Sequence, residues 1–404
     1  MPDMLPTTWD LIRSGLLSTP KITGRRGIRR WLLTAGILLV LIPMGWFHRF
    51  CLALDHLLFP SFKAIEPKKP LFIIGPPRSG TTYLHRLIEK NPEFTTFYFW
   101  ELLLAPAICQ KRFWLGLYAC DSRIGHPGLR CLRFIEQHCF SSMDDIHATS
   151  LMDAEEDYFG LLPLHACFLL IVAFPDCEKL WKLPQFDQWE SSEDRDKVMN
   201  FYRGLLQRHL HVRGHERTLV SKNPSFCGML ASLHDHFPTA RFAIPIRTPE
   251  ETIPSLLSSM RGGPELLGYP AATLEPLLKE MMHRYYQHIG NQLTLLGEQA
   301  AVVPYRDLVG NPHTALTSLA NQLGYDEATL TAGMEPAPST PAKKYRSGHR
   351  YTLEQFGLNQ STLRSEYSWL YDDSRMGLQV SCESGVTTSA ISDSSLAPGV
   401  QSSC

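Results

Sequence analysis

The segment Leu71–Ile88, with the sequence LFIIGPPRSGTTYLHRLI, constrains the fold of this chain more than any other. Four consecutive apolar residues at its start are typical of a strand that is buried on both faces. Gly75 and Gly80 bracket a turn whose backbone N–H groups can converge on an anion, and Thr81 opens a helix whose N-terminal dipole attracts negative charge. The segment therefore predicts a strand, a phosphate-binding loop and a helix.

This loop differs from the usual nucleoside-triphosphate loop at one position. Thr81 follows Gly80 where a lysine is expected, and the cation lies within the turn, at Arg78. Kinases and nucleotide hydrolases of that type need the lysine on the β- and γ-phosphates and an acid for Mg²⁺. The octet GPPRSGTT thus argues against ATP as the ligand. A P-loop kinase or hydrolase is the alternative enzyme class, and a turn that is merely rich in Gly and Pro is the alternative without a ligand.

Alternating strand and helix patterns predict the fold class. Strands are expected at Leu71–Ile74, Thr218–Ser221, Arg241–Ile246 and Ala301–Pro304, and helices at Ser225–Phe237, Glu250–Met260 and His313–Leu323. This alternation predicts an α/β fold with a P-loop-type parallel sheet flanked by helices. Residues 93–217 are interpreted as a helical insertion after the first strand, with helices at Trp100–Cys109, Arg112–Cys120, Leu151–Leu162 and Lys197–His211. An insertion at the ligand edge is a natural place for an acceptor pocket.

Polar residues follow the later strands as they follow the first. Lys222 comes after the second predicted strand, Arg247 ends the third with Ser255 eight residues on, and Arg306 follows the fourth. Because the carboxyl ends of parallel strands meet at one edge of a sheet, these side chains are expected near the loop. A fixed guanidinium with a hydroxyl can hold a terminal phosphate. Helix capping or a surface ion pair is the simpler interpretation of an isolated Arg247, but the loop favours the phosphate.

Several segments together resemble one family. GPPRSGTT resembles the 5′-phosphosulfate loop of the sulfotransferases, which bind 3′-phosphoadenosine 5′-phosphosulfate (PAPS), and RTPEETIPSLLS resembles their 3′-phosphate motif. FPTARFAIPIRTPEE, VVPYRDLVGNP and KKYRSGHRYTLEQFGL are similar to segments of a large bacterial-type sulfotransferase family with a P-loop-like fold. The resemblance covers most of residues 55–372 and implies PAPS as co-substrate, without a required metal.

The resemblance also implies roles for individual residues. The 5′-phosphosulfate is assigned to Arg78, Ser79, Gly80, Thr81 and Thr82, the 3′-phosphate to Arg247 and Ser255, and Lys222, in a Lys-x-Pro segment, is expected near the cofactor. Arg306 and the basic run Lys343, Lys344, Arg346 and Arg350 are secondary candidates, and a solvated loop explains that run equally well.

A hydroxyl acceptor also needs a general base within hydrogen-bond reach. MDAEEDYF, residues 152–159, resembles an acidic signature of the same family, in which Glu155 or Glu156 matches the glutamate. Acids ahead of an apolar helical run also occur as a solvated first turn that complements the helix dipole. His85 and His147 are rivals, although His85 also fits a plain position on the helix face.

The N-terminal part of the chain carries a membrane signal. Five cations precede Trp31–Phe47, a run of 17 residues without Asp, Glu, Lys or Arg. At ~1.5 Å per residue this run spans about 25 Å, short of the roughly 30 Å hydrocarbon core. A short transmembrane anchor, an interfacial or re-entrant helix continued to Phe59, and a helix packed on the catalytic domain are all possible, and membrane attachment ranks first because Trp31 and Trp46 flank the run. The monotopic form is favoured, so that removing residues 1–54 should leave a soluble core.

Composition adds limits on partners and organisation. With 39 basic and 40 acidic side chains, no bulk field indicates nucleic acid. Ten dispersed cysteines without ligand spacing indicate no metal site, and buried free thiols are the simpler interpretation of them. We divide the chain into a polar, basic N-terminus (1–30), an apolar membrane-associated segment (31–59), a sulfotransferase domain (60–378) and a Ser/Thr-rich tail (379–404) that is expected to be disordered.

The sequence therefore predicts a membrane-associated sulfotransferase. The enzyme is expected to move the sulfuryl group of PAPS to a hydroxyl, or an amine, of a carbohydrate, lipid or small-molecule acceptor. A non-catalytic membrane scaffold that retains the fold is the second alternative, after the nucleotide kinase or hydrolase. The catalytic domain is expected in the cytoplasm if the chain is bacterial and in the Golgi lumen if it is eukaryotic.

Overall fold

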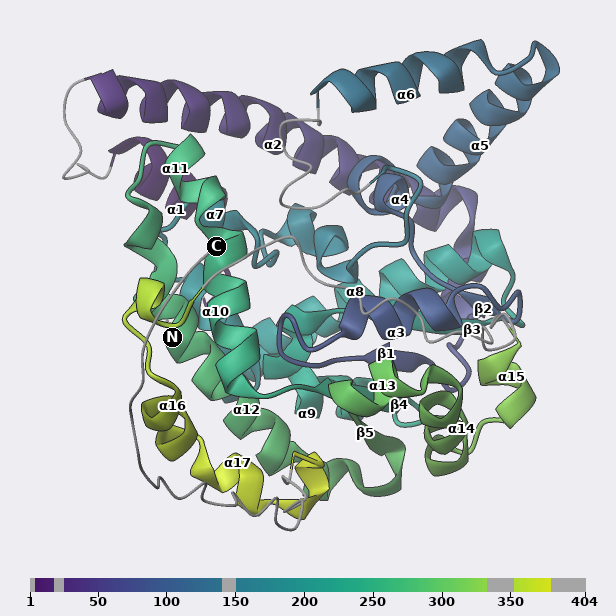
Figure 1. Ribbon diagram of the computed structural model, residues 1–404. Helices are drawn as coiled ribbons and strands as arrows, with labels where there is room; N and C mark the ends of the chain where they lie inside the picture. The colour runs from purple at the N-terminus through teal and green to yellow at the C-terminus, as the bar shows by residue number, and fades with distance from the viewer. Residues whose placement is uncertain (1–3, 18–24, 140–149, 333–351, 379–404) are drawn as a thin grey trace, which may run out of the picture.

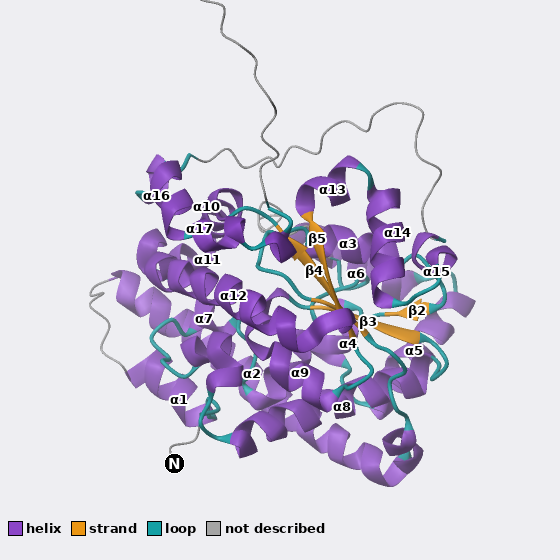
Figure 2. Cartoon of the chain, turned by 90° about the horizontal axis from the view of Figure 1, so that it is seen from below, coloured by secondary structure: helices purple, strands orange, loops and turns teal. Residues whose placement is uncertain are grey.

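The computed structural model describes residues 4–17, 25–139, 150–332 and 352–378. The centre is a five-stranded sheet in which every neighbouring pair is parallel, in the order β2-β3-β1-β4-β5. The strands are β1 Leu71–Ile73, β2 Phe94–Thr95, β3 Thr218–Lys222, β4 Arg241–Ile246 and β5 Ala300–Pro304. Figure 2 shows them fanned through the middle of the molecule with helices on both sides. The predicted α/β class is confirmed, and β2 is a fifth strand that is too short for a sequence pattern to show.

Both faces of the sheet are covered, which explains the unbroken apolar run of β1. Leu71 and Ile73 join a cluster with α3 (Thr81–Ile88) and α14 (Pro312–Leu323), whereas Phe72 joins the larger cluster on the opposite face. That larger cluster includes residues of α8, α9, α10 and α12, with bounds Ser192–Arg213, Leu230–His236, Pro249–Met260 and Glu275–Leu296. Because successive side chains of a strand alternate between faces, each residue of β1 meets an apolar layer.

The insertion between β1 and β3 is helical only in part. It contains α4 (Phe99–Leu104), α5 (Ile108–Arg123) and α6 (Pro127–Cys139) before α8. The predicted helix at Leu151–Leu162 is wrong, because this segment begins with a turn, forms a single bridge at Ala154 and then a 3₁₀ helix at Asp157–Leu164. Its backbone bonds to the residues just before α4 and at its start. The Glu155 amide donates to the carbonyl of Phe97, and the Phe99 amide donates to the carbonyl of Asp153.

The remaining elements close the ends of the domain. They are α7 Leu170–Ala173, α11 Gly262–Leu266, α13 Tyr305–Gly310, α15 Glu327–Thr331, α16 Gln360–Glu366 and α17 Ser368–Asp372, with a 3₁₀ helix at Pro224–Met229 where the sequence predicts the start of α9. The predicted disordered tail, the basic run at 343–350 and His147 lie outside the described residues.

The N-terminal region packs on the domain instead of standing apart from it. Helix α1 (Thr8–Ile12) buries Leu11, and α2 (Arg25–Leu58) runs along one side of the molecule, the top in Figure 1. By length and composition, Gly27–Leu58 could cross a membrane. Yet Leu38, Leu41 and Leu52 belong to the main hydrophobic cluster. Removal of residues 1–54 would therefore expose core surface, contrary to the expectation that it leaves an intact soluble protein.

Candidate active site

The loop between β1 and α3 has the backbone that its glycines predict. A Cβ atom at Gly75 would overlap the carbonyl oxygen of Pro245, so only glycine lets the loop approach β4 this closely. Gly80 has φ +100°, and a Cβ there would lie 2.6 Å from the ring of Tyr305. Arg78 also adopts a left-handed conformation, with φ 71°, which is costly for a residue with a Cβ. Such local strain is common where backbone is arranged around a ligand.

The loop also contains an unsatisfied polar atom. Ser79 is fully buried, and its Oγ has no hydrogen-bond partner within the described residues. A buried hydroxyl without a partner costs about 1–3 kcal/mol. An anion oxygen in the loop would accept its hydrogen bond, so this atom fits the phosphosulfate cradle that the sequence predicts. Thr81 is buried at the start of α3, whereas Thr82 is exposed.

The residues assigned to the two ends of the cofactor meet in this structure. Arg78 Nε donates a hydrogen bond of 2.9 Å to Ser255 Oγ, which joins the loop to α10. Ser255 is buried and Arg78 is half-buried. The contact brings the first and third predicted motifs together at the carboxyl ends of β1 and β4, which are adjacent strands.

Arg247 lies directly after β4, beside the same loop. Its guanidinium pairs with Glu251 at 3.0 Å and stacks on the ring of Tyr305, 4.3 Å from the ring centroid. Tyr286 fixes the backbone there by donating to the Arg247 carbonyl at 2.6 Å. Tyr305 contacts both Arg247 and Gly80, so it is a further residue of the candidate site, although the sequence assigns it no role. Its position after β5 was the available signal.

Lys222 ends β3 and pairs with both candidate bases. Its Nζ lies 3.0 Å from Glu156 and 3.6 Å from Glu155, and its side chain is 3% exposed. The sheet register sets Lys222 beside Ile73, two residues before Gly75, so this ion pair lies at the loop edge of the sheet. The structure thus brings the predicted cation and the predicted acids together, although 66 residues separate Lys222 from Glu156.

A buried acid next to the pair holds this segment in place. Asp157 accepts a 2.6 Å hydrogen bond from Tyr202, whose hydroxyl is also 2.9 Å from Ser221 Oγ. Burial raises the pKa of Asp157 to about 7, and the hydrogen bonds from Tyr202 and Ser221 only partly oppose that rise. Because Ser221 precedes Lys222 in β3, this network fixes Glu155 and Glu156 opposite the lysine. Sequence spacing gives no sign of it.

His85 is not placed for proton transfer with a substrate. Its ring is buried, and Nε2 lies 2.8 Å from Thr96 Oγ1. Burial, helped by the positive charges of Lys222 and Arg86, lowers the pKa of His85 to about 3. The imidazole is therefore neutral and packed in the core, which agrees with the plain helix-face interpretation of this residue.

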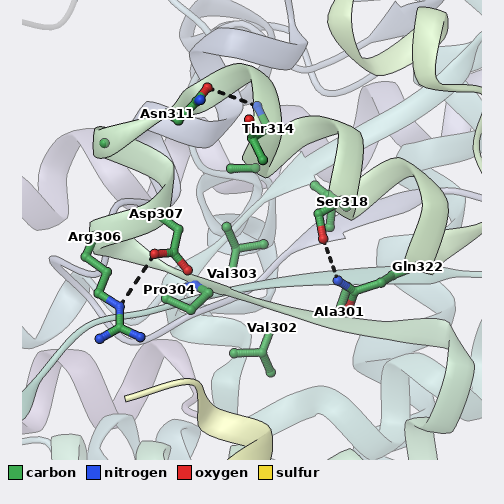
Figure 3. Close-up of a pocket in the computed structure, with 13 residues that line it drawn as sticks. Ala301, Val302, Val303, Pro304, Arg306, Asp307, Asn311, Thr314, Ser318 and Gln322 are labelled. Atoms are coloured by element: carbon green, nitrogen blue, oxygen red, sulfur yellow. Dashed lines mark hydrogen bonds and ion pairs between the residues drawn. The ribbon is translucent and has the colours of Figure 1, made fainter. Parts of the chain in front are cut away.

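Arg306 follows Tyr305 at the start of α13. It is exposed, forms an ion pair of 3.5 Å with Asp307, and lines a groove of about 440 Å³ between β5, α13 and α14. Figure 3 shows this groove with Asn311, Thr314 and Ser318 along α14. None of the other predicted site residues lines it. Within the described residues, no group of three His, Cys, Asp or Glu side chains is arranged to hold a metal ion, and the cysteines from Cys51 to Cys131 and from Cys167 to Cys227 are free thiols.

Comparison with known proteins agrees with the sequence motifs. The model of the Sulfotransferase family matches residues 174–329, a range that includes Lys222, Arg247 and Ser255. The omega-hydroxy-beta-dihydromenaquinone-9 sulfotransferases Stf3 of Mycobacterium bovis and Mycobacterium tuberculosis are 23% identical over 263 residues, which cover 63% of this chain and 62% of each relative. Residues 174–329 of this chain are therefore similar to the sulfotransferase family.

Solved structures of sulfotransferases share the fold over nearly the whole chain. Sulfotransferase STF9 from Mycobacterium avium superposes with a TM-score of 0.66 at 15% identity, covering 91% of both chains. STF1 from M. tuberculosis H37Rv gives a TM-score of 0.59 at 17% identity and covers 89% of this chain and 90% of that one. The P-loop-like fold that the sequence predicts is confirmed.

Proposed function

We propose that this chain is a PAPS-dependent sulfotransferase that forms a sulfate ester on a hydroxylated acceptor, with an amine as the second choice of acceptor group. The observation that supports it best is the convergence of Arg78, Lys222 and Arg247 at the carboxyl ends of three adjacent strands. Parallel α/β sheets bind their ligands at this edge. Three cations around a glycine-shaped loop suit a ligand with two separate anionic groups.

The roles follow from position. The loop amides, Arg78, Ser79 and Thr81 would hold the 5′-phosphosulfate, with Thr82 beside them, and Arg247 with Ser255 would hold the 3′-phosphate. The Arg78–Ser255 hydrogen bond would exchange for bonds to these groups. Tyr305, which already stacks on Arg247, would set the orientation of that guanidinium.

Sulfuryl transfer is an in-line displacement at sulfur. The acceptor oxygen forms the new S–O bond, the S–O bond to the 5′-phosphate breaks, and adenosine 3′,5′-bisphosphate leaves. Charge spread over the sulfuryl oxygens and the leaving phosphate is stabilised by fixed cations and N–H donors. In this proposal Lys222 stabilises that charge. Its partner Glu156, or Glu155, takes the proton of the acceptor hydroxyl as general base.

A lipid is the acceptor class that we favour. The Stf3 relatives are named for a hydroxylated menaquinone, a lipid-like acceptor, and this chain carries the long apolar helix α2. We propose membrane attachment through residues 31–59, with the catalytic domain in the cytoplasm of a bacterium or, in a eukaryote, in the Golgi lumen. The enzyme would then meet PAPS on one side of a membrane and its acceptor within it.

Nucleotide titration separates this function from that of a P-loop kinase or hydrolase. Purified protein should bind adenosine 3′,5′-bisphosphate without added metal and should bind ATP with Mg²⁺ much more weakly, since no lysine follows Gly80. A clear preference for the magnesium nucleotide would overturn the sulfotransferase assignment.

Transfer itself separates the enzyme from a non-catalytic scaffold. Labelled PAPS is incubated with a lipid extract and, in parallel, with a polar extract of the source cells. Label should pass to a lipid fraction and should continue to do so after chelation of metals. A scaffold leaves both extracts unlabelled, and label confined to the polar extract contradicts the lipid acceptor alone.

A further inference from the structure

Helix α2 presents an entirely apolar stripe to the outside. Its outward positions recur every three or four residues and are Ile28, Leu32, Gly36, Leu39, Pro43, Trp46, Phe50, Ala53 and Leu57, all of them exposed. Leu39 is 76% exposed and Trp46 65%. Scattered exposed apolar residues are normal, but a continuous stripe of this length marks an interaction surface.

The inward face of the same helix is mixed, with polar residues between the buried Leu38, Leu41 and Leu52. Arg30, Thr34, His48 and Asp55 are all buried against the domain, among leucines of the main cluster. A helix on a water-exposed surface has the opposite arrangement, with its apolar stripe toward the core and its polar residues outward. Helix α2 departs from this pattern because its exposed stripe is apolar, which fits an apolar phase outside the protein.

Polar contacts fix α2 to the domain near both of its ends. Arg30 pairs with Asp176 at 3.1 Å and lies over the ring of Tyr269, while Asp55 pairs with Arg208 at 3.0 Å. Asp55 also accepts hydrogen bonds of 2.7 and 3.0 Å from two backbone amides at the start of α5. At ~1.5 Å per residue these anchors are about 37 Å apart, more than the roughly 30 Å hydrocarbon core. A helix held in this way cannot cross a bilayer unless the domain beside it enters the bilayer too.

The α5–α6 hairpin adds a second apolar surface on the same side. In Figure 1 it projects from the domain beside α2, and both form the top of the molecule, with the sheet below. Its exposed large apolar side chains are Phe113, Trp114, Leu117, Tyr118, Ile124 and Phe134. Tryptophan at the edge of an apolar surface suits the boundary between lipid headgroups and acyl chains.

The charge of this surface indicates which membrane it fits. Arg29, Arg123 and Arg133 are exposed on it. Among the described residues of α2 and of the hairpin through Phe134, the acids are Asp55 and Asp121. Asp55 is buried, and Asp121 caps α6 by accepting from the amide of Gly128 at 2.7 Å. The exposed charge is therefore basic, as an anionic lipid surface requires.

We propose that α2 and the α5–α6 hairpin form one monotopic docking surface that enters a single leaflet of an anionic lipid bilayer. The proposal extends the membrane attachment given under the proposed function, and it does not depend on the sulfuryl-transfer chemistry. It gives the hairpin, which lies outside the apolar segment 31–59, a part in membrane binding. It also excludes an α2 that spans the membrane.

The test is flotation of the full-length protein with lipid vesicles. Wild-type protein should float with phosphatidylcholine vesicles and better when phosphatidylglycerol is added. Leu39→Glu/Phe50→Glu on α2 and Trp114→Glu/Leu117→Glu on the hairpin should each lower partition by about tenfold or more, because each large side chain leaves lipid. Arg123→Gln/Arg133→Gln should remove only the preference for phosphatidylglycerol.

The matched control is Leu277→Glu/Leu295→Glu, two exposed leucines of α12 that lie outside this surface. It should float like the wild type. Binding of adenosine 3′,5′-bisphosphate, measured on every variant, should be unchanged and separates loss of docking from loss of the fold or of the cofactor site. Wild-type flotation by both surface variants would overturn the proposal, as would a detergent-free dimer that does not bind vesicles.

Topology is tested with an epitope tag on the N-terminus and another on the C-terminus. In sealed membrane vesicles from expressing cells, a protease should reach both tags or neither, because a monotopic helix leaves both on one side. Digestion of only one tag would show that α2 spans the membrane and would refute the single-leaflet arrangement.

Discussion

The sheet edge and helix α2 both break the usual rule that polar side chains face out and apolar ones face in. At the edge, Lys222 is almost fully buried and is stabilised by Glu155 and Glu156. On α2, Leu39 is 76% exposed while neighbouring Leu38 is 4% exposed. In our proposals, the first region places positive charge where the cofactor binds, and the second presents apolar side chains to a membrane outside the protein. Residue type alone therefore does not tell which way a side chain faces.

The two regions also differ in how locally they are determined. The loop needs glycine at 75 because strand β4 lies so close, and at 80 because the backbone there has φ +100° and the ring of Tyr305 lies beside it. The orientation of α2 depends on groups far away in the sequence, such as Asp176 and Arg208. Substitutions in the loop and on α2 test whether the two regions differ in this way.

The largest effect is expected at the loop. Arg78→Ala removes a fixed cation from the transferring group, which should raise the barrier by about 3 kcal/mol or more and lower turnover on the order of a hundredfold. The control is Arg86→Ala, which replaces an exposed arginine on α3, the helix that follows the loop. This variant should retain turnover. Steady-state assays with PAPS measure both, and normal turnover in Arg78→Ala would remove this residue from the site.

Leu38 and Leu39 give a matched pair on α2. Leu38→Ala should lower the free energy of unfolding by about 2–4 kcal/mol, because it leaves a cavity in the main cluster. Leu39→Ala should change it by less than about 0.5 kcal/mol, because its side chain is outside the core. Thermal unfolding in one buffer measures the difference. Equal destabilisation of the two variants would mean that α2 does not sit on the domain in this orientation.

Arg247→Ala should weaken the cofactor with little change in turnover at saturation. Loss of a charge-assisted hydrogen bond costs about 1.5–3 kcal/mol, or roughly 10- to 100-fold in affinity. The loss should appear with adenosine 3′,5′-bisphosphate and be small with adenosine 5′-phosphosulfate, which lacks the 3′-phosphate. Calorimetric titration of both ligands checks this, and equal binding of the two ligands by the wild type would contradict the role of Arg247.

The smallest effect concerns the pH dependence of stability at Asp157. Because burial raises its folded pKa from 3.8 to about 7, the folded protein binds more protons than the unfolded chain between these values. The contribution of Asp157 is thus greatest at the acid end of this window and is lost as the pH rises toward 7. His85, with its pKa lowered to about 3, acts in the opposite direction.

Asp157→Asn isolates the first of these two contributions while keeping a polar partner for Tyr202. The stability of the wild type minus that of the variant should fall as the pH rises from about 4 to about 7. Denaturant unfolding at a series of pH values gives this difference. Parallel curves for the two proteins would show that Asp157 does not take up its proton in the folded state.

Much of the fold was predictable from the sequence because its signals are local. The strands at 71, 218, 241 and 300, the turn after the first strand, and α10 and α14 all carry patterns within a few residues of one another. The two-residue strand β2 carries no such pattern. The apolar residues at 151–162 satisfy a helical period, but backbone hydrogen bonds from 153–155 to 97–99 prevent a helix at the start of this segment.

The sequence by itself determined the glycine-shaped turn between strand and helix that we propose as the anion site, because such a turn orients its own amides and its own arginine. Only the tertiary structure decided which acids meet Lys222 and which face of α2 meets the protein. Glu156 reaches the lysine because Asp157 is bonded to Tyr202 on α8. Helix α2 turns Leu39 outward and Leu38 inward because Arg30 and Asp55 have ionic partners on the domain. Contacts between groups so far apart in the chain leave no periodic trace in the sequence, since each depends on a fold that must already exist.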